Sequence, residues 1–285
     1  MDYELLHRVW LAAHGTAWLH GDGGLPPDPA SDMVARLTQC EGVDFVVGDG
    51  VTRDVGLVRW FLGARRTMDA AAWFAELRAR GCTRLWVCRT AFDGGPAHRQ
   101  LESYGPHGRP AASGVGTEYA AYGYVPEATA ILAAVGDVVT EAWTLDYEGK
   151  PVRRPIPPGG FGYLAHYQYL ATPAGVVPET PELAAAAAGL TAALDRASAP
   201  EHIERRARQL LAGAALEPDE EWLPPLYPDL ARRLVAAGAR SPYWSGGGAW
   251  GQIVGEPTSW PALEELGAAT ADAIVAGINA PLGNR

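Results

Sequence analysis

A histidine and an aspartate one residue apart, His20 and Asp22, have a spacing that is typical of metal sites. In non-haem iron enzymes a His-x-Asp pair supplies two ligands of a facial triad, and a later histidine, here His107 or His166, would be the third. The chain has 7 histidines and 33 acidic residues, so that roughly one such pair is expected by chance. A His-x-Asp metal enzyme is therefore an alternative hypothesis and not the leading one.

Acid/base chemistry is the leading hypothesis, and its candidates are the catalytic residues His107, Glu118 and His166. The first two lie in segment 93–123, where the hydrophobic periodicity stops and glycines accumulate, and the third lies on a strand predicted nearby. Long segments without a pattern inside compact domains are often functional loops, which can bring a general acid and a general base into one cleft. The competing interpretation is that His166 and the tyrosines fill a half-buried sheet face.

Arginine and aromatic residues are the candidate ligand contacts. Arg89 follows a predicted strand and would hold a carboxylate or phosphate with two hydrogen bonds, although an internal salt bridge explains it equally well. Two tryptophans bracket a glycine-rich loop near the C-terminus, and their rings would line a pocket or anchor a partner protein. The aromatic candidates are Tyr104, Tyr119, Tyr122, Trp244 and Trp250.

Composition excludes several classes of function. The net charge of −10 and the pI near 5.2 disfavour nucleic-acid binding, which needs a basic surface. The single lysine, Lys150, stands in Glu148-Gly149-Lys150-Pro151, which is typical of a turn. Pyridoxal phosphate enzymes, P-loop nucleotide hydrolases and protein kinases all need a placed lysine, so these classes are disfavoured. The sequence does not identify a cofactor.

The cysteines and the hydropathy of the chain indicate the cellular compartment in which we expect the protein. Cys40, Cys82 and Cys88 are odd in number and have no C-x-x-C spacing, which disfavours a disulfide framework or a structural zinc site and favours buried thiols. No apolar run approaches eighteen residues, and the N-terminus does not resemble a signal peptide. We expect a cytoplasmic protein with no membrane association, and the arginine and alanine bias indicates a GC-rich bacterial genome.

The elements that would position these residues begin with the stretch from Val43 to Phe92. Its pattern predicts strands at 43–47 and 55–62, a helix capped by Asp69 and ended by Gly81, and a strand at 85–88. Because 85–88 is apolar on both faces, we expect it to be central in the sheet. A direct parallel pairing of the strands on either side of the helix would make a right-handed crossover.

Other elements flank this stretch. The sequence predicts a first helix from Asp2 with an apolar stripe ending at Ala13, a loop from His14 onward, and a short helix at 31–37. It also predicts a helix at 125–135, a hairpin of 138–147 with 152–156, and a strand at 161–170 that carries its aromatic and histidine residues on one face.

Beyond the proline-rich stretch 172–181 the pattern becomes helical. Helices are predicted from Pro181 to Arg196, from Pro200 past Leu211 with Arg205, Arg206 and Arg208 facing water, from Asp229 to Ala237, and from Pro261 to Ile278. The predicted fold class is therefore α+β: a mixed sheet with packed helices in residues 1–175, followed by an all-helical part in residues 176–285.

Two classes of function are compatible with this organisation. The leading hypothesis is a bacterial enzyme or binding protein that acts on a small organic molecule in an aromatic-lined pocket. The alternative is an acidic protein-binding module, of immunity or regulatory type and without catalysis, whose exposed tryptophans dock on a basic target. A deep cavity with converging ionisable groups would favour the first, and a flat aromatic patch the second.

Overall fold

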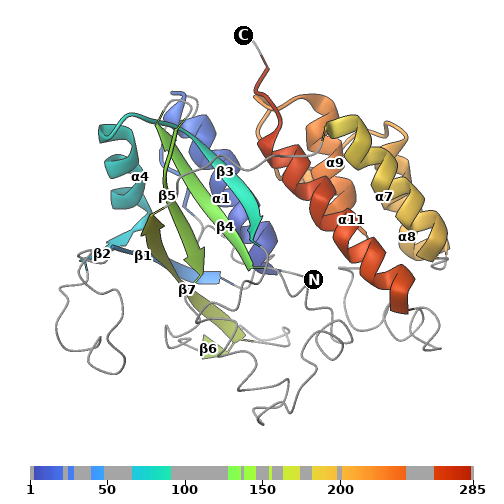
Figure 1. The fold of residues 1–285 in the computed structure, drawn as a ribbon, viewed down its shortest axis with the longest axis horizontal. Coiled ribbons are helices and arrows are strands. Elements are labelled where there is room, and N and C mark those ends of the chain that lie inside the picture. The colour runs from blue at the N-terminus through green and yellow to red at the C-terminus, as the bar shows by residue number, and fades with distance from the viewer. Residues whose placement is uncertain are drawn as a thin grey trace. The chain divides into compact units, whose positions relative to one another are not determined.

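The structure is a computed structural model of the 285-residue chain. The residues that it describes are 3–21, 25–28, 40–47, 66–90, 128–135, 138–145, 154–155, 163–173, 182–197, 201–241 and 260–283. They form helices and a β-sheet, so the chain has the α+β content that the sequence predicts (Figure 1). None of the helices within these residues is both long and apolar enough to cross a bilayer.

The sheet joins strands that are distant in the sequence. Its strands are β1 (Cys40–Val47), β2 (Arg66–Asp69), β3 (Cys82–Thr90), β4 (Ala128–Val135), β5 (Val138–Leu145), β6 (Arg154–Pro155) and β7 (Tyr163–Pro173). Their order is β2-β1-β7-β5-β4-β3, and β6 pairs with β7 outside this order. β1 runs parallel to β7, whereas the pairs β1–β2, β4–β5, β5–β7 and β6–β7 are antiparallel. The sheet is therefore mixed, as predicted.

The helix α4 (Ala70–Ala79) packs on β1 as its sequence signals predict. The carboxylate of Asp69 accepts a hydrogen bond of 2.7 Å from the amide of Ala72, and Gly81 follows the helix with a φ of +78°. The ring of Trp73 stacks on that of Phe45, with centroids 3.8 Å apart, and neither side chain is exposed. The strand before this helix is β2, whereas the strand predicted at 55–62 lies outside the described residues.

The first helix, α1 (Tyr3–Leu19), is longer than predicted. The loop expected from His14 onward is wrong up to Leu19, because Gly15 serves as a packing position within the helix. A Cβ at Gly15 would lie 2.4 Å from the ring of Phe74 and 2.8 Å from Leu85. The absence of a side chain lets α1 approach α4 and β3 closely, and this packing outweighs the low helix propensity of glycine.

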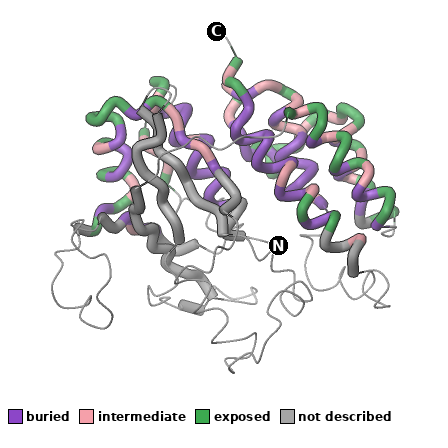
Figure 2. The backbone as a smooth tube through the Cα atoms, viewed as in Figure 1, coloured by how far each residue is buried: buried purple, intermediate pink, exposed green. Residues whose placement is uncertain are grey.

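Residues 7–18 of α1 are buried on all sides of the helix and not along one stripe, with only His14 partly exposed (Figure 2). The predicted apolar stripe is therefore incomplete, because polar residues are buried too. His7 has no exposed surface and Arg8 is 4% exposed, although both were expected outside the stripe. A helix buried all round lies in the interior of a molecule.

β3 lies at the end of the strand order, so its predicted central position is wrong among the described strands. Only one face is fully buried: Leu85 and Val87 have no exposed surface, whereas Arg84 and Trp86 are half-buried. The hydroxyl of Thr16 accepts a hydrogen bond of 3.0 Å from the amide of Leu85 and lies 3.4 Å from its carbonyl oxygen. α1 thereby supplies a polar partner to the backbone of a terminal strand.

Two predictions in the middle of the chain are wrong. The helix predicted at 125–135 is the strand β4, because a short apolar run fits a strand as well as a helix and its periodicity does not distinguish the two. β5 pairs with β4, starting at Val135 opposite Val138, and not with residues 152–156. β6 pairs with β7 instead.

The helices after residue 182 follow the prediction closely. They are α7 (Leu183–Ala197), α8 (Glu201–Leu211), α9 (Asp229–Ala239) and α11 (Trp260–Asn279), with a short 3₁₀ helix, η1, at Pro218–Glu220. α9 and α11 touch through glycines: a Cβ at Gly238 would lie 2.5 Å from Ile274, and one at Gly277 would lie 2.5 Å from Val235. Nearby, the buried hydroxyl of Thr270 donates a hydrogen bond of 3.0 Å to that of Ser241.

The chain divides into two compact units, which we call the sheet unit (10–88 and 129–177) and the helical unit (1–9, 89–128 and 178–285). One boundary, between Val177 and Pro178, falls near the predicted boundary at 175. The helical unit also takes in two segments that the sequence analysis assigned to the first domain. A single division at 175 therefore stays a prediction.

Candidate functional site

The sheet unit has one face against helices and a second face with polar residues. Phe45 packs on α4, and Leu85 packs beside Gly15 of α1. Residues adjacent to these along a strand, and their partners on neighbouring strands, belong to the opposite face, because successive residues of a strand alternate between faces. This second face comprises the positions Asp44, Arg84, Trp86, His166 and Gln168.

Arg84 and Trp86 form a direct contact on the second face. The guanidinium carbon of Arg84 lies 3.9 Å from the centre of the Trp86 ring system. Both side chains are half-buried, and they alternate with Leu85 and Val87, which are fully buried. A guanidinium stacked on an indole is a cation–π pair, and its in-plane N–H groups are suited to planar or anionic groups.

His166 occupies a distinctive place in the strand register. It pairs with Gly42 of β1, and the register between β1 and β7 shifts there, because Cys40 pairs with Ala165 and leaves Glu41 as an extra residue. Such an irregularity is a β-bulge, and bulges are frequent beside functional sites, where they redirect side chains. The residue opposite His166 is Gly42, which has no side chain.

The tyrosines of β7 are not on the face of His166. Tyr167 pairs with Val43 and Tyr169 with Phe45, which places both on the face that packs on α4. The predicted strand at 161–170 is confirmed as β7, but its expected single face of aromatic and histidine residues is wrong. Because successive residues of a strand belong to opposite faces, Tyr167 and Tyr169 are on one face of the sheet and His166 is on the other.

Arg89 and His166 are in the same sheet but not on neighbouring strands. Arg89 is near the end of β3, and β4 and β5 lie between β3 and β7 in the strand order. Three strand spacings correspond to on the order of 14 Å. Because residues alternate along β3, Arg89 also belongs to the face of Leu85 and Val87 and not to the second face. A ligand on the second face is therefore not expected to contact both Arg89 and His166.

The other predicted site residues lie outside the described part of the chain. They are His107, Glu118, Tyr104, Tyr119, Tyr122, Trp244 and Trp250. Their roles stay predictions. Arg84 and Trp86, in contrast, are absent from the sequence-based candidates, although the alternation of polar and apolar residues from Arg84 to Val87 was a signal for a strand with two different faces.

The hypothesis of a His-x-Asp metal site gains no support from the described residues. His20 is exposed one residue after the end of α1, where its amide donates a 3.0 Å hydrogen bond to the Thr16 carbonyl, and Asp22 lies outside the described part. Within the ranges that the structure describes, no group of three histidine, cysteine or acidic residues is arranged to hold a metal ion. The hypothesis stays a prediction.

α1 contains a buried histidine, His7. Burial, with a smaller contribution from the charge of the adjacent Arg8, lowers the pKa of His7 from 6.5 to about 3. His7 is thus neutral at neutral pH. It can contribute hydrogen bonding and packing, but it is a poor general acid because it binds no proton in that range.

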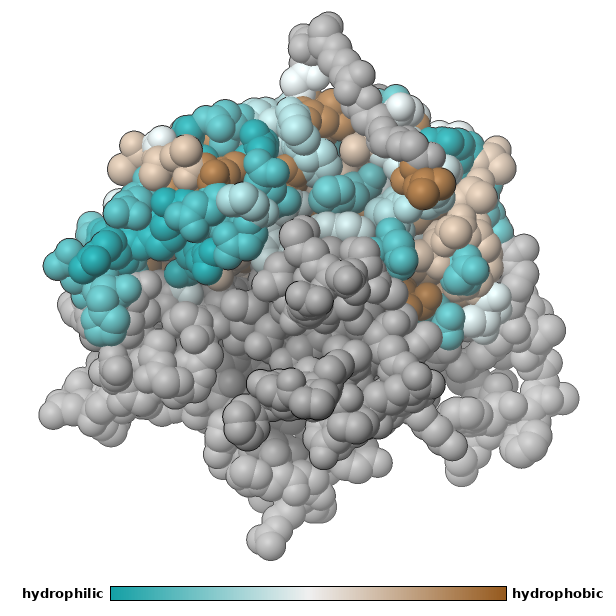
Figure 3. Space-filling model, turned by 180° about the vertical axis from the view of Figure 1, so that it is seen from behind, coloured by the Kyte–Doolittle hydropathy of each residue, from teal (hydrophilic) through white to brown (hydrophobic). Residues whose placement is uncertain are grey.

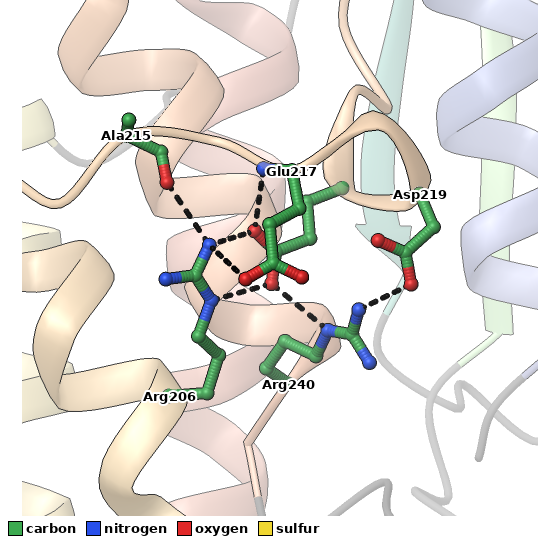
Figure 4. A network of polar contacts seen from close by, with 6 residues as sticks. Arg206, Ala215, Glu217, Asp219 and Arg240 are labelled. Carbon is green, nitrogen blue, oxygen red and sulfur yellow. Dashed lines mark hydrogen bonds and ion pairs between the residues drawn. The ribbon is translucent and has the colours of Figure 1, made fainter.

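The helical unit contains a cluster of charged residues around Glu220, drawn in Figure 4. Glu220 is 1% exposed and accepts hydrogen bonds from the guanidinium groups of Arg206 and Arg240 and from the amide of Glu217. The hydrogen bonds with Arg206 lower the pKa of Glu220 and raise the pKa of Arg206. The expectation that Arg206 faces water is therefore wrong, since its side chain is 26% exposed and bound to a buried carboxylate.

Each carboxylate oxygen of Glu220 already accepts two hydrogen bonds. The cluster is therefore suited to stabilising the fold and not to binding a metal or substrate.

The comparisons with known proteins yield no match: no family model, no curated protein and no solved structure is significantly similar to this chain. The geometry of the second face is therefore the basis for a functional proposal.

Proposed function

We propose that the protein binds a small organic molecule on the second face of the sheet. The observation that carries this proposal is the Arg84–Trp86 pair, which is half-buried on that face while the other face of the same strand is fully buried. A stacked cation and ring form a rigid platform that is chemically suited to a planar or anionic ligand. The β-bulge beside His166 and the glycine opposite it support the same location.

The acid/base part of the proposal is assigned to His166, with His107 and Glu118 as its predicted partners. Segment 93–123 begins three residues after the end of β3, the strand that carries Arg84, Trp86 and Arg89. Loops that follow the strands of a rigid sheet commonly carry functional residues. The roles of His107, Glu118 and the tyrosines of that segment stay predictions, because these residues lie outside the described part of the chain.

We also propose a domain organisation and a cellular location. The chain would have an α+β part in residues 1–175 and a helical part in residues 176–285, and the protein would be in the cytoplasm of a bacterium. The described strands all fall between Cys40 and Pro173, and the described elements after residue 182 are helical, which supports the first point. Cys82 is a buried cysteine that is not in a disulfide, which is compatible with a reducing compartment.

The test is to identify and compare bound ligands. Small molecules that copurify with the full chain are released by denaturation and identified by mass spectrometry, and a panel of organic acids is screened by thermal shift. We expect R84Q and H166A to lose the bound molecule and the thermal shift. R205Q, which alters an exposed arginine of α8, is the matched control and should keep both.

The proposal fails if folded R84Q and H166A bind the same molecules as strongly as the wild type does. It also fails if neither mass spectrometry nor the panel finds any ligand for the wild type. Turnover is a separate question: a H166A variant that binds the ligand normally but has lost turnover would assign His166 to catalysis.

A further inference from the structure

The connection between α8 and α9 contains a segment that we call the strap, residues Ala214–Glu221. α8 ends at Leu211, and Gly213, with a φ of +101°, turns the chain away from the helix. The strap residues Ala215, Glu217, Pro218 and Asp219 are exposed. Apolar burial therefore holds little of the strap, and its attachment depends on polar contacts.

The exposed acidic residues of the strap each pair with an arginine of the adjacent helices. Glu217 lies 3.4 Å from Arg206 of α8. Asp219 lies 2.5 Å from Arg240, which follows α9, and Glu221 lies 3.4 Å from Arg232 of α9. These three carboxylates are 56 to 61% exposed, so each pair contributes little by itself and is screened by salt. Figure 3 shows hydrophilic residues gathered on the helical unit, at the left of that view.

Glu220 differs from these three residues because its carboxylate is buried. It joins three parts of the unit, since Arg206 donates from α8, Arg240 from the end of α9, and the Glu217 amide from within the strap (Figure 4). Arg206 also donates a hydrogen bond of 2.9 Å to the carbonyl of Ala215. The removal of the Glu220 charge would leave Arg206 and Arg240, whose side chains are 26% and 39% exposed, without the carboxylate that they share.

The chain after the strap is anchored in another way. Trp222, Leu223 and Tyr227 are buried, and the amide of Gly283 donates a hydrogen bond of 3.0 Å to the carbonyl of Leu226. These contacts do not involve Glu220. The apolar anchor thus sets a C-terminal limit to any local opening, and the glycine turn at Gly213 sets the N-terminal limit.

We propose that the strap opens and closes as one unit, with Glu220 as its latch, while the helices on either side stay folded. The groups that face Glu220 are Arg206 and Arg240 from the helices and Glu217 and Asp219 from the strap. Protonation of Glu220 opens the strap, because it removes the charge that both arginines share. Salt opens it less, since a buried pair is weakly screened.

Hydrogen–deuterium exchange of the full chain tests the latch. At neutral pH we expect E220Q to lower the protection factors of the strap amides by about tenfold or more, with the flanking helices α8 and α9, and also α7 and α11, unchanged. E221Q is the matched control, because Glu221 is adjacent in the strap but exposed, and we expect a change below about threefold. Wild-type protection of the strap should persist in 1 M salt and fall as the pH drops below 4.5, the ordinary pKa of the glutamate carboxyl.

Two results would overturn the latch. Unchanged strap protection in folded E220Q would show that the strap does not depend on Glu220, and an equal loss of protection in α7 and α11 would show that Glu220 supports the whole unit. R206K decides the matter where E220Q does not fold. It keeps the charge but loses the two-point contact, so the latch requires lower protection in the strap alone.

Discussion

The two units of this chain use polar groups in opposite ways. In the sheet unit, the interior joins rings and neutral groups: Trp73 stacks on Phe45, and the Thr16 hydroxyl satisfies the backbone of Leu85. In the helical unit, glycine contacts bring α9 and α11 together, while arginine–carboxylate pairs connect the helices at and near the surface. The contact of Thr16 with the backbone of Leu85 is thus neutral and buried, although the sheet unit also has charged contacts, such as the Arg84–Trp86 pair and the exposed Asp69 cap. The ion pairs that join the described helices of the helical unit are charged and partly exposed.

The difference indicates which unit should respond to which perturbation. Neutral buried contacts depend on shape and are insensitive to salt, whereas half-exposed ion pairs are weak individually and sensitive to salt and acid. We expect changes of shape to have large effects in the sheet unit and changes of single exposed charges to have small effects in the helical unit.

The largest effect is expected from the ring stack of the sheet unit. Trp73→Ala removes a fully buried indole, so we expect a loss of about 3–5 kcal/mol in the free energy of unfolding. Urea denaturation followed by circular dichroism measures it. Leu25→Ala is the control, because Leu25 is 83% exposed and its truncation should change stability by less than about 0.5 kcal/mol. A similar loss in both variants would contradict the assignment of the core.

Sequence patterns predicted this part of the fold well, for a physical reason. The strand at 43–47, the Asp69 cap and the Gly81 terminator are local signals, and each depends only on residues close in sequence. The role of Gly15 depends on Phe74 and Leu85, far along the chain, and no local pattern contains that contact. The same holds for the strand order, which put β3 at one end although its residues are apolar.

The candidate site was also only partly predictable, because local sequence patterns do not contain contacts between distant residues. His166 was predicted from its residue type, but the bulge and the glycine opposite it come from the pairing of β7 with β1, which are separated by more than a hundred residues. Arg84 was overlooked because the strand was interpreted as apolar on both faces. Arg206 was assigned to solvent because its helix is amphipathic, whereas a buried carboxylate from the following connection covers it.

A pH titration extends the comparison, because the helical unit includes a fully buried histidine, His7, that is neutral at neutral pH. The unfolded chain binds a proton at His7 below pH 6.5, but the folded chain does so only near its lowered pKa of about 3. Stability is therefore complete above pH 6.5 and is lost as the pH falls from there toward 3. At pH 4.5 we expect the loss to be at most about 3 kcal/mol relative to pH 7.

Urea denaturation of the wild type and two variants between pH 7 and pH 4.5 isolates the contribution of His7. H7Q cannot bind the proton in either state, so its stability should change less with pH even though its packing is poorer. H20Q alters a histidine that is exposed and should keep the wild-type slope. An equal slope for H7Q and the wild type would show that His7 is not the group responsible.

A smaller effect should come from the helix contact of the helical unit, which tests whether shape matters there too. In Gly277→Ala the new methyl group would lie 2.5 Å from Val235 and 2.9 Å from the carbonyl of Ala231. We expect a loss of about 1–3 kcal/mol. Gly189→Ala is the matched control in α7, since nothing lies within 4 Å of its Cβ position, and it should stabilise the helix by up to about 1 kcal/mol. A loss of stability in Gly189→Ala as well would contradict this expectation, because its new methyl group meets no neighbouring atom and alanine has the higher helix propensity.

The smallest effects compare a buried neutral contact with an exposed charged one directly. Thr16→Val keeps the volume but removes the hydroxyl partner of the Leu85 amide, so we expect a loss of about 1–2 kcal/mol that does not depend on salt. Glu265→Gln weakens the two-point contact with Arg196, whose partners are about half-exposed, and should cost less than about 1 kcal/mol and nothing measurable in 1 M salt. Thr16→Ser, which restores the hydroxyl, should recover part of the loss. If Glu265→Gln were the more costly change at every salt concentration, the contrast between the two units would have to be reversed, because exposed charge would then outweigh buried polarity in this chain.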